Sequence, residues 1–352
     1  MPRCSSQRPV DASLPRRGLL LGAAALVVSG CAKSATMTAS RTPVLGVKQL
    51  DAEVRAIAKR AAPGVLGFSL MNLESGQSWT WEGERRFPMQ SVFKMLLGAA
   101  VLSEVDAGRA ALNEAISIGE KDLSPPWSPI ADAWPGRTVY STEELLVAAV
   151  SNSDNTAADI LMKRIGGPGA VTGWLGAKDI EEVRVDRYER ELAPEANGLG
   201  SFRPAWKGGA NFQAALTTVP VEQRRAAAEA YLRDPRDTAT PRGMMVFLSR
   251  LDAGELLSPE STRRLVTIMA NSPRGPERLK SGLPKDAFFA HKIGTGGTFE
   301  GRISAYNDVG IFTLADKRSY AITAFLTAST RDEPARAALL ADLGRAAVRA
   351  IG

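Results

Sequence analysis

Apolar residues follow a helical period in some segments of this 352-residue chain and a strand pattern in others. A repeat of three to four residues, typical of an amphipathic helix, marks the terminal segments 47–62 and 333–351. In the middle of the chain, segment 91–105 is apolar on most sides, which predicts a buried helix. Further helices are predicted at 141–150, 155–165, 242–253 and 258–271. Capping signals support two of them, because Ser141 opens a capping box and Pro259 suits a first helical turn.

Segments rich in β-branched and aromatic residues, bounded by turn signals, predict the strands. The predicted strands are 67–73, 78–82, 288–293, 303–313 and 319–327. The simplest arrangement of this order is an α+β fold, an α/β sandwich. An antiparallel sheet of about five strands would be covered by the terminal helices, with an all-helical subdomain inserted between its strands. A cleft between the two parts is the natural place for a site.

One catalytic domain is expected over residues 44–352. Its α/β part would comprise about 44–86 and 285–352, and its helical part about 87–284. The composition, 44% hydrophobic and 23% charged, is that of an ordinary globular protein. Such a chain can build a core large enough to shape a cleft.

The amino terminus has the pattern of an export signal. The pair Arg16-Arg17 precedes an apolar run, and small residues precede Cys31. This predicts a signal peptide at 1–30, with a twin-arginine motif and a lipobox, and lipidation of Cys31. The apolar run is too short for a transmembrane helix, and residues 31–43 are expected to be a tether. A plain signal peptide with an incidental cysteine is the alternative. Either way, we expect a periplasmic protein, and with the lipobox a membrane-anchored one.

Scarce histidine and cysteine narrow the chemistry. The chain has one histidine, His291, and two cysteines, Cys4 and Cys31. A zinc site needs three or four ligands, so no metal is expected. A Ser-His-Asp triad could use only His291. The net charge of +6 lies partly in the expected signal peptide, and no basic stripe indicates a nucleic-acid partner. Acid–base chemistry is therefore expected to use lysine and glutamate.

Ser91 and Lys94 form a Ser-x-x-Lys pair at the start of a predicted helix. Three residues apart, they share one face of that helix, and its macrodipole favours negative charge developing at Ser91. A serine hydroxyl needs a base to become a good nucleophile, and a lysine buried in an apolar helix can be that base. Alone the pair is weak evidence, because it occurs by chance about once in a chain of this length.

Three further groups are candidates. In the Ser-Asp-Asn tripeptide, Ser153 could relay a proton to a leaving nitrogen and Asn155 could hold a substrate amide. Alone, however, the tripeptide is better explained as a helix N-cap, with Asp154 bonding backbone. Lys292 adds positive charge beside a glycine turn, which lets backbone N–H groups approach a ligand closely. Glu189 lies in a charge run of the kind that is usually solvated.

The order of these motifs resembles that of class A β-lactamases and penicillin-binding proteins. The resemblance covers nearly the whole mature chain. Trp127 stands where that family places an aromatic residue at the cleft mouth. Segment 186–189 resembles the start of the family's omega loop, 237–241 resembles its end, and 307–309 matches a strand signature.

The resemblance implies a mechanism. Ser91 would attack the lactam carbonyl, helped by Lys94, by Glu189 acting through a water, or by both. The backbone N–H groups of Ser91 and Thr295 would form the oxyanion hole. Glu189 would then activate a water to hydrolyse the acyl-enzyme. This last step separates a lactamase from a penicillin-inhibited peptidase.

The resemblance also implies the binding residues. Ser153 would help to protonate the departing nitrogen, and Lys292 with the Thr295 hydroxyl would hold the substrate carboxylate. The other implied binding residues are Asn155, Trp127 and Gly294. The implied partner is a small β-lactam, with no cofactor, no nucleic acid, membrane contact only through the lipid anchor, and a monomeric protein.

Three departures from the family pattern stand out. Ala193 replaces an asparagine that helps to hold the deacylating water. Ile293 replaces a hydroxyl residue near the carboxylate site, for which Thr295, Arg302 or Arg336 is expected to compensate. An insertion at about 194–233, with a predicted helix within it, lengthens the omega loop, and such long insertions are usually functional.

Two alternatives remain open from the sequence. One is a D,D-peptidase that β-lactams acylate without turnover. The other is a non-catalytic, lipid-anchored protein that binds cell wall, which only Ala193 and Ile293 favour. Glu189 is the residue that favours β-lactam hydrolysis through a Ser91 acyl-enzyme over both of them.

Overall fold

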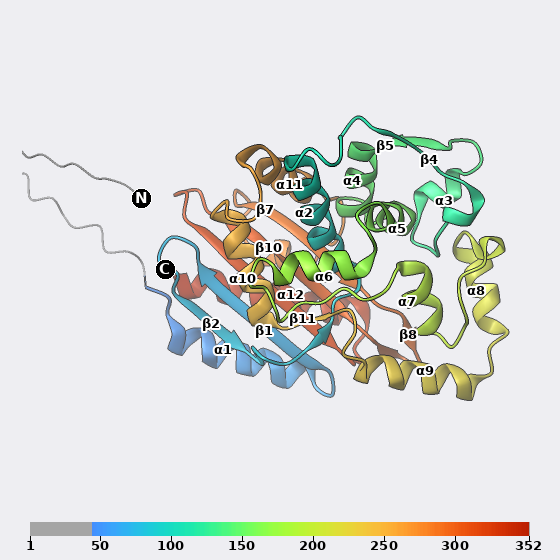
Figure 1. The fold of residues 1–352 in the computed structure, drawn as a ribbon. Coiled ribbons are helices and arrows are strands. Elements are labelled where there is room, and N and C mark those ends of the chain that lie inside the picture. The colour runs from blue at the N-terminus through green and yellow to red at the C-terminus, as the bar shows by residue number, and fades with distance from the viewer. Residues whose placement is uncertain (1–43, 352) are drawn as a thin grey trace, which may run out of the picture. The chain divides into compact units, whose positions relative to one another are not determined.

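A computed structural model describes residues 44–351. Its sheet consists of β1 (Val65–Asn72), β2 (Ser78–Trp81), β7 (Phe288–Thr295), β10 (Tyr306–Thr313) and β11 (Ser319–Thr327). The strands are antiparallel neighbours in the order β2-β1-β11-β10-β7 (Figure 1). The register of the central pair places Val65 opposite Thr327. The predicted antiparallel sheet of five strands is thus confirmed.

Helices cover both faces of this sheet. The terminal helices α1 (Val47–Ala61) and α12 (Glu333–Ile351) pack on one face. Along β11, Tyr320 and Ile322 contribute to that core, whereas Ala321 and Phe325 belong to the core on the other face. Because both faces are covered, the strand is a nearly continuous hydrophobic run rather than an alternating one.

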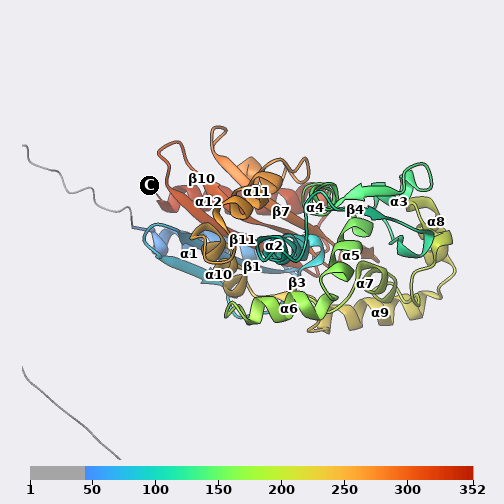
Figure 2. The same ribbon diagram turned by 45° about the horizontal axis from the view of Figure 1, so that its top comes forward.

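The helical part lies between β2 and β7 in the sequence. Its helices are α2 (Phe93–Asp106), α3 (Pro129–Ala133), α4 (Thr142–Val150), α5 (Asn155–Arg164), α6 (Pro168–Gly176), α7 (Glu189–Glu195), α8 (Gly209–Thr217), α9 (Val221–Arg233), α10 (Pro241–Asp252) and α11 (Pro259–Ala270). Short strands pair as β3 (Phe87–Pro88) with β6 (Thr238–Ala239), β4 (Ala115–Ser117) with β5 (Val139–Ser141), and β8 (Thr298–Phe299) with β9 (Arg302–Ile303). Figure 2 shows α3, α5, α7, α8 and α9 gathered at one end, away from α1.

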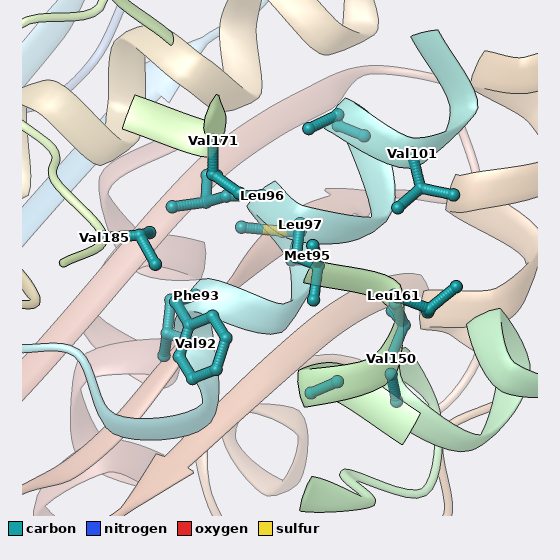
Figure 3. Packing of buried hydrophobic residues seen from close by; sticks show 14 of the residues in the cluster. Val92, Phe93, Met95, Leu96, Leu97, Val101, Val150, Leu161, Val171 and Val185 are labelled. Atoms are coloured by element: carbon teal, nitrogen blue, oxygen red, sulfur yellow. The ribbon is translucent and has the colours of Figure 1, made fainter. Parts of the chain in front are cut away.

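Helix α2 is the centre of the helical part. Every residue from Phe93 to Leu102 is buried, so this part of the helix is covered on all sides, as its mostly apolar sequence predicts. Met95, Leu96 and Leu97 are among its buried side chains, and Figure 3 shows them in one cluster with residues of α4, α5 and α6. This packing fixes the helix that carries the Ser-x-x-Lys pair.

Most predicted elements are confirmed to within a few residues, and the differences have physical causes. The predicted helix 91–105 begins as a 3-10 turn, η1 (Gln90–Val92), before α2. The predicted single strand 303–313 is wrong at its start, because Ile303 pairs with Thr298 in the β8–β9 hairpin. Helix α6 was not predicted, since its three glycines and proline lower its helix propensity.

The remaining predictions concern the amino terminus, membrane-spanning helices and metal sites. The signal peptide, the tether and Cys31 lie outside the described residues. Among residues 44–351, no helix is both long and apolar enough to cross a bilayer. The same residues contain no group of three or more His, Cys, Asp or Glu side chains placed to hold a metal ion.

The residues that flank segment 194–233 are hydrogen-bonded to each other. The backbone N–H of Asp186 donates to Asp237, and the N–H of Asp237 donates back to Asp186 at 2.8 Å. The buried Arg187 pairs with Asp237 at 2.7 Å and with Asp234 at 3.2 Å. These contacts hold the two ends of the insertion together.

Replacing Arg187 by Met is expected to lower the free energy of unfolding by about 3–5 kcal/mol, because the carboxylate of Asp237, 2% exposed, would lose its counterion. Urea denaturation measures this. The control is Arg236→Met: Arg236 pairs with Asp234 at 2.7 Å, but its side chain is 41% exposed, so less than about 1 kcal/mol is expected. Equal losses of unfolding free energy in the two variants would contradict a special role for the buried Arg187–Asp237 pair.

Candidate active site

Ser91 lies in the turn η1, directly before α2. Gln90, the preceding residue, has φ of 49°, a left-handed conformation that is uncommon for residues other than glycine. The Asn307 amide holds this turn from behind by donating to the carbonyls of Pro88 at 2.8 Å and Met89 at 3.1 Å. The turn therefore presents Ser91 at the start of a buried helix, where the helix dipole favours negative charge.

The edge strand β7 passes directly beside this turn. A Cβ on Gly294 would lie 2.2 Å from the carbonyl oxygen of Met89, so only glycine allows the approach. The close packing brings the backbone of Gly294 and Thr295 next to Ser91. It also carries Lys292, two residues earlier, to the same face of the strand.

Lys94 is the hub of the site, and its side chain is fully buried. Its Nζ donates to Ser91 Oγ at 2.9 Å, to the Ser153 carbonyl at 3.0 Å, and to Asn155 Oδ1. The same Nζ lies 3.1 Å from Glu189 Oε1, whose side chain is 5% exposed. One ammonium group thus links the nucleophile, the Ser-Asp-Asn segment and the glutamate.

Ser153 and Lys292 form the second contact of the site. Lys292 Nζ donates to Ser153 Oγ at 2.9 Å and to the Ile293 carbonyl at 3.1 Å. Burial holds the pKa of Lys292 well below its usual range, and the positive charges of Lys94, Arg274 and Arg278 lower it further. An anionic ligand at this end of the cleft would offset that repulsion.

Asp154 and Asn155 have the structural roles expected of a helix entry. Asp154 is the N-cap of α5, and its carboxylate accepts the N–H groups of Ala157 at 2.9 Å and Ile130 at 2.8 Å. Asn155 donates its amide to the Pro125 carbonyl at 3.1 Å. The N-cap interpretation and the functional one are therefore compatible, since the cap positions the amide beside Lys94.

Glu189 begins helix α7 and is buried, not solvated as its charge run suggests. Asp159, inside α5, accepts the N–H of Glu189 at 2.7 Å and that of Arg190 at 3.0 Å. Ser124 donates its hydroxyl to the same carboxylate at 2.6 Å. Asp159 therefore fixes the first turn of α7, and with it the position of the Glu189 carboxylate.

These groups surround one cleft of about 380 Å³. Six of the nine site residues expected from the sequence line it: Ser91, Trp127, Ser153, Asn155, Glu189 and Thr295. The other three contact residues of the cleft: Lys94 donates to Ser91, Lys292 donates to Ser153, and Gly294 packs against the nucleophile turn. The structure thus brings all nine together.

His291 has no place in this group. It is adjacent to Lys292 on β7, so strand alternation turns it to the opposite face of the sheet. Its Nδ1 lies 2.7 Å from Asp308 Oδ1, and its ring stacks on Phe289. The histidine is a buried structural residue, and a Ser-His-Asp triad with Ser91 is excluded.

The sequence interpretation missed the arginine beside Thr295. Arg278 donates to Thr295 Oγ1 at 2.6 Å and is 3% exposed. Of the two arginines expected to compensate, Arg302 lines the cleft and pairs with Glu229, and Arg336 lies over the Tyr306 ring. A lone arginine in a loop before β7 carries no motif, so no sequence signal distinguished Arg278.

Comparisons with known proteins agree with this geometry. Residues 49–351 match the model of the β-lactamase enzyme family. The chain belongs to the class A β-lactamases. The β-lactamase L2 of Stenotrophomonas maltophilia is 30% identical over 96% of this chain and 100% of its own length. VEB-1 of Pseudomonas aeruginosa is 29% identical over 80% of this chain and 83% of its own.

Solved structures extend the similarity to three dimensions. A class A β-lactamase of the last common ancestor of Gram-negative bacteria has a TM-score of 0.70 at 32% identity, over 86% of this chain and 99% of that one. A β-lactamase from Chitinophaga pinensis has a TM-score of 0.69 at 31% identity, over 84% and 97% of the two chains. Neither the D,D-peptidase nor the non-catalytic alternative is favoured.

In this class A β-lactamase, the two departures near the chemistry face the cleft. Ala193 and Ile293 both line it. Asn197, four residues after Ala193, also lines the cleft and donates its amide to the Ala193 carbonyl at 2.8 Å. The side-chain oxygen of Asn197 therefore stays available to another donor.

Asp159 gives this β-lactamase a testable pH dependence. Burial raises the pKa of Asp159 to about 7, and the charge of Glu189 adds to the effect. Between about pH 4 and 7 the folded protein retains a proton that the unfolded chain, with a pKa of about 3.9, has lost. The free energy of unfolding should therefore fall as pH rises through this window.

The variant Asp159→Asn lacks this titration, so its unfolding free energy should fall less steeply between pH 4 and 7. Each pKa unit is worth about 1.4 kcal/mol, and a difference of a few kcal/mol across the window is expected. Urea denaturation at half-unit pH steps measures it. Parallel profiles for the two proteins would contradict the prediction.

Proposed function

We propose that this β-lactamase opens the β-lactam ring by forming an ester on Ser91, and that a water activated by Glu189 hydrolyses the ester. The observation that carries this proposal is the chain of contacts from Ser91 Oγ to Lys94 Nζ to Glu189 Oε1, at 2.9 and 3.1 Å. Along it Lys94 can first give a proton to Glu189 and then, as a neutral amine, accept the serine proton. Alternatively, the serine proton passes through a water directly to the Glu189 carboxylate.

The developing negative charge and the leaving nitrogen each have a partner. The backbone N–H groups of Ser91 and Thr295 stabilise the oxyanion, which the close approach of Gly294 to the nucleophile turn supports. Ser153 Oγ, 2.9 Å from Lys292 Nζ, gives a proton to the departing nitrogen. Lys292 supplies the positive charge that favours this transfer.

Substrate recognition divides between two ends of the cleft. The ring carboxylate binds Lys292 and the Thr295 hydroxyl, which Arg278 orients at 2.6 Å. Because Arg278 provides charge there, the hydroxyl missing at Ile293 is compensated. The Asn155 amide holds the substrate's side-chain amide, and Trp127, which is 51% exposed, covers the mouth.

The deacylating water needs a second partner besides Glu189. Ala193 has no polar group to offer, and we assign this role to the side-chain oxygen of Asn197 at the same wall of the cleft. Hydrolysis of the ester then regenerates Ser91.

We also propose where the enzyme works. Residues 1–30 direct export, and Cys31 carries a lipid that anchors residues 44–352 to the membrane through a tether at 31–43. The Arg16-Arg17 pair and the small residues before Cys31 support a periplasmic lipoprotein. The enzyme is proposed to act as a monomer on small β-lactams.

The purified mature protein should hydrolyse a chromogenic cephalosporin repeatedly. Replacing Glu189 by Gln removes the base for deacylation, so kcat should fall about 10²–10⁴-fold and an acyl-enzyme should accumulate. Intact-mass spectrometry detects this adduct, and Ser91→Ala should abolish it.

Glu191→Gln is the matched control, because Glu191 lies on the same helix turn. Within residues 44–351, the Glu191 carboxylate accepts a hydrogen bond only from the Tyr188 N–H, at 3.0 Å. This variant should turn over the cephalosporin at the wild-type rate. Stoichiometric labelling of the wild type without turnover would instead indicate a D,D-peptidase. Complete unreactivity would indicate a binding protein.

A further inference from the structure

The insertion 194–233 builds a wall of the active-site cleft. Phe212 and Leu216 from α8 and Ala228 and Leu232 from α9 line it. In both Figure 1 and Figure 2, α8 lies beside α3 and α9 lies beside α7. The cleft therefore continues past the catalytic groups into an extension that α8 and α9 line.

One cation in this extension has no counterion. Arg224, on α9, lines the cleft and is half-buried, with its guanidinium 5.1 Å above the ring of Phe299. Its Nε is buried and has no hydrogen-bond partner. Among residues 44–351, no carboxylate lies within 4.0 Å of it.

The neighbouring arginines are, in contrast, paired. Arg225, the next residue, contacts Glu222 at 2.7 Å and also Glu300. Arg302, which also lines the cleft, pairs with Glu229. Arg224 thus stands apart from these neighbours, because its charge faces the cleft without a carboxylate.

This arrangement is suited to an anionic ligand. A guanidinium that has lost part of its hydration without gaining a partner is costly, and a carboxylate would offset that cost with charge-assisted hydrogen bonds. Phe299 beneath it and Phe212 in the same extension offer aromatic contact. The chemistry that fits is a carboxylate attached next to an aromatic ring.

The substrate's ring carboxylate is already assigned to Lys292 and the Thr295 hydroxyl, so Arg224 is free for a second one. We propose that Arg224 forms a subsite for a carboxylate on the acylamino side chain of the β-lactam. This rests on the proposed function, because the side chain is oriented by the ester on Ser91 and the amide on Asn155. The insertion thereby selects dianionic β-lactams.

A pair of penicillins tests the subsite directly. Benzylpenicillin and carbenicillin differ only in a carboxylate on the benzyl side chain. Arg224→Gln should lower kcat/KM for carbenicillin about 10-fold or more and change kcat/KM for benzylpenicillin less than about 2-fold. Arg225→Gln is the matched control and should change neither, since that side chain is 42% exposed and paired outside the cleft.

The outcomes are distinct. An unchanged carbenicillin-to-benzylpenicillin ratio in Arg224→Gln overturns the subsite and leaves the proposed function intact. Equal losses for both penicillins also overturn it, because Arg224 would then serve the shared carboxylate. Failure of the wild type to form an acyl-enzyme with either penicillin, read by intact mass, overturns the proposed function and the subsite together.

Discussion

The buried ammonium group of Lys94 is the interaction on which the site depends. A fully buried charge is stable only when its surroundings pair it and satisfy its hydrogens. Here the partners come from three separate segments: the nucleophile turn, the entry of α5 and the first turn of α7. Because each segment contacts Lys94, the side chains of Ser91, Asn155 and Glu189 all lie within contact distance of its Nζ atom.

The sheet supplies the opposite side of the same site. Its edge strand approaches the nucleophile turn because Gly294 has no side chain, and the next strand holds that turn through Asn307. The chemistry therefore needs segments 200 residues apart to meet, as the 218-residue separation of Asn307 and Met89 illustrates. The covered sheet provides the rigidity that such long-range contacts require.

The sequence predicts those features that follow from local rules. The Ser141 capping box is in place and Pro259 begins α11, because these signals depend on residues close together in the chain. Arg278 could not be found this way, since its function follows from a fold that returns it to Thr295. Asp159 was not predicted for the same reason. An aspartate within a helix is ordinarily exposed, and only tertiary packing brings Asp159 to the backbone N–H of Glu189.

The insertion shapes the wall of the cleft without holding the catalytic glutamate in place. Arg187 and Asp237 hold the two ends of the inserted segment together, and closing a flexible loop costs only about 0.6 kcal/mol more when its length doubles. The catalytic glutamate lies before the inserted residues and is held by α5, not by them. Variation among the cleft-lining residues of α8 and α9 can therefore change which antibiotics fit while Asp159 still positions the glutamate.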